Sequence, residues 1–333
     1  KLESNHACSS CVVCLLDQCA HKDDKYVANG NYEGKQYDNY DCRYTKHRAY
    51  NSTKAFMKKK IVLIKFGGSI LTDKTVEQSV KYDVLRSLIG QIKLIVERRP
   101  DIQIVLAHGQ GSFAHFPVKK YRLHEGFVDE HSVYGCAVAL DVVAKLNRII
   151  ITEMLAQKLP AVSLFPSQIS VASNGQPDST YLATLEEYLR LGLLPVLTGD
   201  VITDKQKGSC IWSADFLLPY YARQLRNLGW DVQTVVHVTK TPGVYRDLNL
   251  PDLGIFETIT PTSFAELSAT LGGSHGVDVT GGMLEKVRQA VELAQDGIAS
   301  AIMSNENDQL LRFVCDGQCD GTMITPELTT DSK

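Results

Sequence analysis

Two histidines flank a glycine-rich stretch in "VLAHGQGSFAHF", which runs from residue 105 to 116. Histidine is a common metal ligand, and His108 and His115 could together hold a zinc ion for a hydrolase. The pair lacks the i, i+4 spacing of a helical zinc motif, however, and the glycines between them argue against a helix. Gly109 and Gly111 instead let the backbone amides of a loop approach an anion such as phosphate. Zinc chemistry remains an alternative to phosphate binding at this stretch.

A second glycine turn, "KFGGS", follows the strand-like run "IVLIKF". Gly67 and Gly68 allow close approach of the backbone to a ligand, and Lys65 adds a compact positive charge. Ser69 completes the turn. The same residue types also occur in turns without a ligand, and this turn alone is therefore weak evidence for phosphate binding.

A third turn, "TGGMLEK", opens a predicted helix over residues 281–297. The free N–H groups and the dipole at a helix start favour a phosphate, and Lys286 projects from the first turn beyond Gly282. Three such turns in one protein favour nucleotide chemistry. The chain has no GxxxxGK[ST] loop, no dinucleotide GxGxxG motif and no HRD or DFG motif, which disfavours P-loop enzymes and protein kinases.

The elements that must position these turns alternate between strands and helices from residue 61 onward. "IVLIKF" and "IQIVLAH" are predicted strands, and the amphipathic stretch "YDVLRSLIGQIKLIVERR" between them is a predicted helix. The same alternation predicts further strands at 161–165, 194–200, 234–238 and 299–304, and further helices at 137–157, 180–192, 215–229 and 281–297. This succession predicts a mostly parallel sheet with helices on both faces and ligands at the carboxyl ends of the strands. "TDKQKG" at 203–208 is a predicted hairpin turn.

Four motifs, in this order, resemble the isopentenyl phosphate kinases of the amino acid kinase superfamily: "IVLIKFGGSILTDK", "HGQGSFAHFPVKKY", "LPVLTGDVITD" and "DVTGGMLEKV". The resemblance covers residues 58–326. It implies an α/β fold, an open three-layer α/β/α sandwich with a mostly parallel central sheet. It also implies a phosphate-acceptor lobe over residues 57–205, an ATP-binding lobe over 206–328 and a tail over 329–333.

The resemblance further implies ATP-dependent phosphorylation of isopentenyl phosphate to isopentenyl diphosphate in isoprenoid biosynthesis, by direct in-line transfer. Dimethylallyl phosphate is the expected second substrate, Mg²⁺ is expected to accompany ATP, and the expected assembly is a homodimer. Within the superfamily, kinases of amino acids, carbamate, UMP or fosfomycin remain alternatives.

Matching positions in the motifs carry the expected roles. The expected catalytic residues are Lys65, Lys74 and His115. The expected ATP-binding residues are Lys65, Gly67, Gly68, Ser69, Gly111, Gly282 and Lys286. The expected substrate-binding residues are Gln110, His115, Gly199 and Asp200. No residue is assigned as a metal ligand. His115 is expected to donate a hydrogen bond to the acceptor phosphate, which favours a phosphate or phosphonate acceptor. Retention of Lys65, Lys74, His115 and Lys286 together argues against an inactive binding module with the same fold.

The chain departs from the family pattern at three places. Ala114 stands where the family usually has glycine, and a methyl group there restricts positive φ. "SAD", ending at Asp215, replaces "SGD", and "VTKTPGVY" has Lys240 and Pro242 in place of acidic residues. These changes bear on loop geometry and nucleotide affinity.

The composition limits the classes of binding partner and the cellular compartment that we expect. The 333 residues are 44% hydrophobic with a formal net charge of −3, which offers no general attraction to nucleic acid or anionic lipid. No apolar run approaches the roughly 20 residues of a membrane span, and no secretory signal is evident, which predicts a cytoplasmic protein.

The first 56 residues differ in character from the rest. They are polar, and they hold the CxxCxxC stretch of Cys8, Cys11 and Cys14, which could bind zinc or an iron–sulfur cluster. They show no apolar periodicity on which a core could be built. We expect residues 1–56 to be a disordered or non-native extension, with the working protein starting at Met57.

Overall fold

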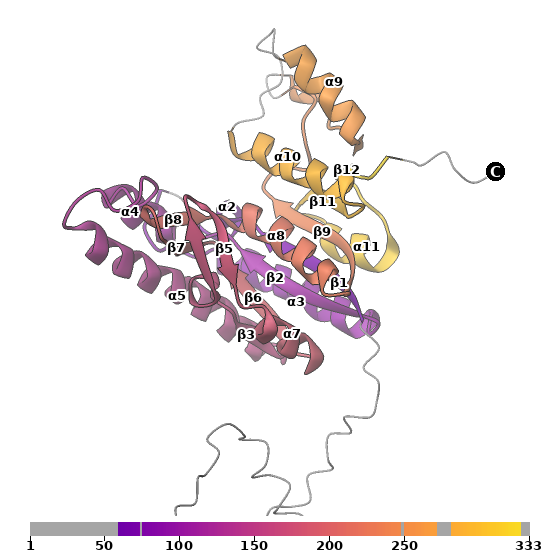
Figure 1. The fold of residues 1–333 in the computed structure, drawn as a ribbon. Helices are drawn as coiled ribbons and strands as arrows, with labels where there is room; N and C mark the ends of the chain where they lie inside the picture. The colour runs from indigo at the N-terminus through magenta and orange to yellow at the C-terminus, as the bar shows by residue number, and fades with distance from the viewer. Residues whose placement is uncertain (1–58, 74, 248–249, 272–280, 328–333) are drawn as a thin grey trace, which may run out of the picture. The chain divides into compact units, whose positions relative to one another are not determined.

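An eight-stranded sheet forms the centre of the protein in a computed structural model, which describes residues 59–73, 75–247, 250–271 and 281–327 (Figure 1). The strands, in order across the sheet, are β10 (Thr258–Ile259), β12 (Thr322–Ile324), β11 (Ala299–Ser304), β9 (Asp231–Thr239), β1 (Lys60–Phe66), β2 (Ile102–His108), β6 (Leu194–Thr198) and β3 (Ala161–Ser163). The six strands from β11 to β3 are parallel, and β12 runs antiparallel to β11. The predictions for residues 1–56, Lys74 and the tail over 329–333 lie outside the described residues.

Alternating side chains of β1 pack into two separate hydrophobic cores, because successive residues of a strand point to opposite faces of the sheet. Val62, Ile64 and Phe66 pack with helices α3 (Tyr82–Arg98), α5 (Ser132–Ala156) and α11 (Gln309–Asp316). Ile61 and Leu63 pack on the other face with α7 (Ala183–Arg190), α8 (Ala214–Asn227) and α10 (Gly281–Gln295). The sheet is therefore the middle of three layers, and the predicted α/β/α sandwich is confirmed.

A smaller sheet lies beside the main one and was only half predicted. Its order is β5 (Gln176–Thr180), β4 (Ser170–Ser173), β7 (Asp200–Asp204) and β8 (Gly208–Trp212). The antiparallel pairing of β7 with β8 confirms the hairpin turn predicted at residues 203–208. The hairpin of β4 and β5 was missed.

The predicted strands and helices all occur, with ends displaced by a few residues. The remaining elements are α2 (Gly68–Leu71), α4 (Ser112–Lys120), α6 (Pro166–Ile169), η2 (Pro251–Leu253) and α9 (Pro261–Leu271). Because the eight-stranded sheet holds strands from both sides of residue 205, the two-lobe division stays a prediction. None of the described helices is long and apolar enough to cross a bilayer.

Candidate active site

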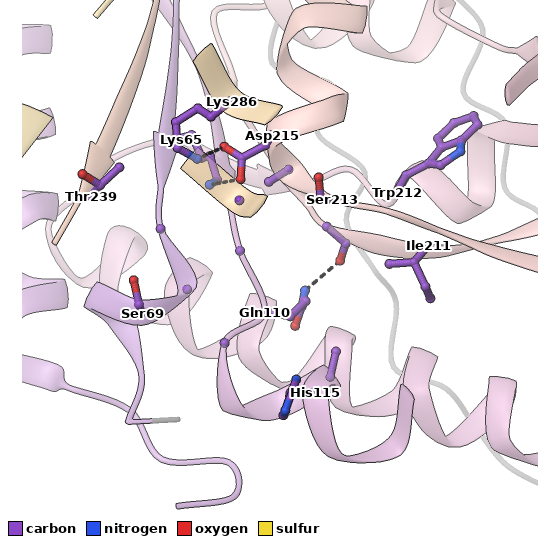
Figure 2. Close-up of a pocket in the computed structure, with 18 of the residues that line it drawn as sticks. Lys65, Ser69, Gln110, His115, Ile211, Trp212, Ser213, Asp215, Thr239 and Lys286 are labelled. Carbon is purple, nitrogen blue, oxygen red and sulfur yellow. Dashed lines mark hydrogen bonds and ion pairs between the residues drawn. The ribbon is translucent and has the colours of Figure 1, made fainter. Parts of the chain in front are cut away.

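A cavity of about 470 Å³ opens where the parallel strands β1, β2, β6 and β9 end (Figure 2). Every predicted site residue that the structure describes lines it: Lys65, Gly67, Gly68, Ser69, Gln110, Gly111, His115, Gly199, Asp200, Gly282 and Lys286. Parallel strands present their carboxyl ends at one edge of a sheet, and this brings together residues far apart in sequence. The structure thus places these residues around one cavity, and their individual roles stay predictions.

The glycine turns after β1 and β2 contact each other backbone to backbone. A Cβ atom on Gly68 would lie 2.4 Å from the amide nitrogen of Gly111, and one on Gly109 would lie 2.7 Å from that of Gly68. Gly111 also has φ +50°, a conformation that L side chains rarely adopt. Glycine is therefore required here by close packing of the two turns that line the cavity.

The stretch after Gly111 is a helix rather than the predicted loop. Helix α4 begins at Ser112, and Ala114 lies within its first turn without a positive φ. The prediction that Ala114 restricts the loop through positive φ was wrong, because a helical residue does not need that conformation. His115 is exposed on this helix, with its side chain at the edge of the cavity (Figure 2).

The two histidines of the opening motif have separate environments. His108 is fully buried, and its Nε2 accepts a hydrogen bond from Asn147 Nδ2 at 3.1 Å. Burial lowers the pKa of His108 to about 4. His108 does not line the cavity, whereas His115 does. No cluster of three or more metal-ligating side chains occurs in the described part of the chain.

Two lysines meet one carboxylate at the base of the cavity. Lys65 Nζ lies 2.7 Å from Asp215 Oδ2, and Lys286 Nζ lies 2.5 Å from Asp215 Oδ1. Lys65 comes from β1, Asp215 from the first turn of α8 and Lys286 from α10 (Figure 2). The carboxylate therefore bridges two ammonium groups and holds them side by side.

Burial and charge set the protonation of this trio. Burial lowers the pKa of Lys65 to about 8 although Asp215 opposes the shift, and the charge of Lys286 adds to the lowering. Burial alone would raise the pKa of Asp215, but the charge of Lys65, the neighbouring His237 and the charge of Lys286 hold it well below its usual range. With both lysines protonated, two positive charges face one negative charge and leave one net positive charge at the cavity.

Asp215 was not among the predicted site residues, although "SAD" had been compared with the family's "SGD". Ser213, two residues before it, caps α8, because its Oγ accepts a hydrogen bond from Phe216 N at 3.2 Å. The cap fixes the helix start so that the second helical residue, Asp215, faces the lysines. An acidic residue placed just after an N-cap at the end of a strand was the available signal.

The side of the cavity near β6 and β7 is polar. Gln110 Nε2 donates to the carbonyl oxygen of Gly199 at 3.0 Å. Asp200 is buried, and its two oxygens accept hydrogen bonds from Ser167 N and Val201 N, both at 2.9 Å. Burial nevertheless raises the pKa of Asp200 to about 6. These contacts fix Gln110 and Asp200 in place at the cavity wall.

Beyond His115 the wall becomes apolar. The apolar side chains in this part of the lining are Val118, Val143, Val201, Ile211 and Trp212. Val143 belongs to the predicted helical stretch 137–157, which is part of α5. The cavity therefore combines a cationic and glycine-rich end with an apolar wall.

The carboxylates in the described lining do not form a site for Mg²⁺. Asp215 is held by two lysines, and both oxygens of Asp200 accept backbone hydrogen bonds. A Mg²⁺ site in a protein usually combines one or two free carboxylates with phosphate oxygens and water. The described residues therefore do not fit a protein-held magnesium ion.

Comparison with known proteins agrees with the motifs. The model of the amino acid kinase family matches residues 60–304. The isopentenyl phosphate kinase of Methanocaldococcus jannaschii is 31% identical over 235 residues, which are 68% of this chain and 85% of that protein. The isopentenyl phosphate kinase of Methanothermobacter thermautotrophicus is 29% identical over 255 residues, which are 73% of this chain and 91% of that protein.

A solved structure gives the same result. X-ray structures of isopentenyl phosphate kinase include a chain that superposes with a TM-score of 0.66 and 25% identity, covering 79% of this chain and 100% of the solved one. The fold of this chain is thus similar to one already known for an isopentenyl phosphate kinase. The chain is a member of the amino acid kinase family, within which it groups with the isopentenyl phosphate kinases.

Proposed function

We propose that this protein transfers the γ-phosphoryl group of ATP to isopentenyl phosphate, giving isopentenyl diphosphate and ADP, in isoprenoid biosynthesis. Dimethylallyl phosphate is the proposed second acceptor. The observation that carries the proposal is the bridged pair of Lys65 and Lys286 beside the glycine turns, in a cavity that also reaches His115 and an apolar wall.

The net positive charge at the lysine pair suits a reaction between two anions. ATP and a phosphate monoester repel each other, and phosphoryl transfer depends mainly on positioning and on neutralising the charge of the transferring group. Lys65 and Lys286 are held by Asp215 before any ligand arrives, so that little reorganisation is needed. We assign Lys65, Gly67, Gly68, Ser69, Gly111, Gly282 and Lys286 to the ATP side.

The acceptor needs no strong general base, because its attacking oxygen belongs to a phosphate that is already ionised near neutral pH. We assign His115 to donate a hydrogen bond to this phosphate, with Gln110, Gly199 and Asp200 completing the acceptor side. Lys74 is assigned by motif to stabilise the charge of the transferring group. In-line displacement follows from placing ATP and the acceptor at opposite ends of one cavity.

The apolar wall favours an acceptor with a hydrocarbon group. Val118, Val143 and Ile211 offer no partner for the ammonium and carboxylate groups of an amino acid or for the base of UMP. A five-carbon alkenyl chain would bury its surface there without leaving polar groups unpaired. This contrast supports the isoprenoid monophosphate over the other acceptors of the superfamily.

We propose that Mg²⁺ enters the site bound to ATP, because neither Asp200 nor Asp215 is free to ligate it. The ion would supply charge neutralisation of the nucleotide phosphates. A homodimer, a cytoplasmic location and the division into an acceptor lobe over 57–205 and an ATP lobe over 206–328 are further parts of the proposal.

A panel of acceptors tests the function. The full chain is incubated with ATP, Mg²⁺ and one acceptor at a time: isopentenyl phosphate, dimethylallyl phosphate, fosfomycin, glutamate or UMP. ADP release is measured at several acceptor concentrations. The proposal expects the largest kcat/KM with isopentenyl phosphate. A larger kcat/KM with fosfomycin, glutamate or UMP would overturn it.

A further inference from the structure

A buried histidine lies behind the lysine pair, on a strand whose sequence gave no reason to single it out. The register of β9 pairs His237 with Lys65 of β1 on one side and with Ile302 of β11 on the other. Paired residues of neighbouring strands project from the same face of a sheet. The side chains of His237 and Lys65 therefore project together towards α8 and α10, which carry Asp215 and Lys286.

His237 directly contacts the bridging carboxylate. Its Nδ1 lies 3.3 Å from Asp215 Oδ1, the oxygen that also accepts from Lys286 Nζ. The side chain is 1% exposed, and neither ring nitrogen has a partner with regular hydrogen-bond geometry in the described part of the chain. An apolar residue would fill this place without burying two polar nitrogens, and a buried imidazole set against a charged carboxylate therefore calls for an explanation.

Burial, helped by two neighbouring lysines, keeps the ring of His237 neutral. The pKa of His237 is lowered to about 4, mainly by burial and also by the charges of Lys286 and Lys65, although Asp215 opposes the shift. The groups that face the ring are Asp215 from α8, Lys65 from β1 and Lys286 from α10, with the apolar Ile302 from β11. Near neutral pH the ring is therefore uncharged, and one nitrogen carries a proton that it can donate.

We propose that neutral His237 is a positioning residue for the phosphoryl transfer, whose Nδ1–H holds Asp215 Oδ1 and fixes the carboxylate between Lys65 and Lys286. The inference rests on the proposed function. With one more donor, rotation of the carboxylate is restricted, and both ammonium groups keep their places. His237 acts through Asp215 and touches neither reactant.

The position of His237 predicts which kinetic constant it affects. Lys65 and Lys286 act on the transferring group, whereas the acceptor phosphate is assigned to His115 on α4. Loosening Asp215 should therefore lower kcat and leave the KM for isopentenyl phosphate nearly unchanged.

Two amide variants separate positioning from packing. The Nδ2 atom of asparagine takes roughly the place of histidine Nδ1, while the amide nitrogen of glutamine reaches the place of Nε2. His237→Asn should keep kcat within about 3-fold of the wild type, because it retains a donor near Asp215 Oδ1. His237→Gln and His237→Leu should lower kcat roughly 10-fold, as expected when a hydrogen bond to a charged group is lost.

Kinetics of the wild type and the three variants with ATP and isopentenyl phosphate form the test. Turnover by the wild type tests the proposed function. Failure of that function can therefore be distinguished from failure of the role of His237. Equal kcat in all four proteins, an equal loss in all three variants, or a loss confined to KM would each overturn the role of His237. If His237→Leu does not fold, the asparagine and glutamine variants decide. A higher kcat for His237→Asn than for His237→Gln supports the positioning role, and an equal kcat for the two variants overturns it.

Discussion

Lys65 on the central strand β1 forms an ion pair with Asp215 at the start of α8, with 2.7 Å between Nζ and Oδ2. The two residues are 150 positions apart in the sequence. Their pairing links the glycine turn after β1 to the end of the β7–β8 hairpin, and Lys286 joins them from α10. In the proposed reaction this arrangement sets the charge that the cavity offers to ATP.

Asp215→Asn should lower kcat roughly 100-fold, the order of loss seen when a preorganised electrostatic group is removed. The amide cannot neutralise two lysines, and Lys65 and Lys286 would then repel each other in a buried site. Steady-state kinetics at saturating ATP and acceptor measure the effect. Asp178→Asn, which breaks only the surface pair with Lys205, is the matched control and should keep wild-type kcat. Wild-type kcat in Asp215→Asn would contradict the role of the bridge.

Activity should fall as pH rises through about 8. Lys65 is positively charged below its pKa of about 8 and neutral above it, and neutral Lys65 attracts the phosphates of ATP less. The measurement is kcat/KM for ATP across pH 6 to 10, roughly two units on either side of this pKa. Lys65→Arg keeps its charge over this range and should remove the decline near pH 8, whatever its absolute activity. The same decline in Lys65→Arg would assign it to another group.

His115→Ala should lower kcat/KM for isopentenyl phosphate by roughly 10- to 150-fold, which corresponds to about 1.5–3 kcal/mol for a hydrogen bond to a charged group. The KM for ATP should change little, because His115 is assigned to the acceptor side. His124→Ala is the control, since this histidine is exposed and does not line the cavity. An equal loss in kcat/KM for both substrates would argue against a contact with the acceptor alone.

Lys74→Ala should mainly reduce kcat, because its role is assigned to the transferring group rather than to the bound substrates. This prediction rests on the "LTDK" motif, since Lys74 lies outside the described residues. Lys145→Ala removes a lysine paired with Asp141 on the exposed side of α5 and serves as the control. Turnover of Lys74→Ala at the wild-type rate would show that the motif match misassigns this lysine.

Periodicity predicted the layers of the fold because its strands are buried on both faces. β1 and β2 are almost continuously apolar, and α3 between them is strongly amphipathic. The β4–β5 hairpin was missed because β5 is mostly exposed and polar. Its turn did carry a signal: Asn174 and Gly175 both have positive φ, as Asn-Gly does in tight hairpins.

The residues of the candidate site were predictable where glycine and lysine stand at the ends of strands. They were less predictable where a residue joins the site only through contacts between segments far apart in the sequence. Gly109 and Gly111 suggested a loop through Ala114, but the chain turns helical at Ser112 as soon as the close contact with Gly68 is passed. His237 in "TVVHV" resembles an ordinary core residue. Only the register of β9 with β1 places it beside Lys65 and Asp215.

The most direct test of phosphoryl transfer in this cavity is ³¹P NMR of the full chain with ATP, Mg²⁺ and isopentenyl phosphate. If the proposed transfer occurs, the monophosphate signal is replaced by the two coupled signals of a diphosphate monoester, with ADP formed in equal amount. Asp215→Asn should show this conversion at a much lower rate. Release of inorganic phosphate without a diphosphate product, or no change in the acceptor signal, would contradict phosphoryl transfer to isopentenyl phosphate.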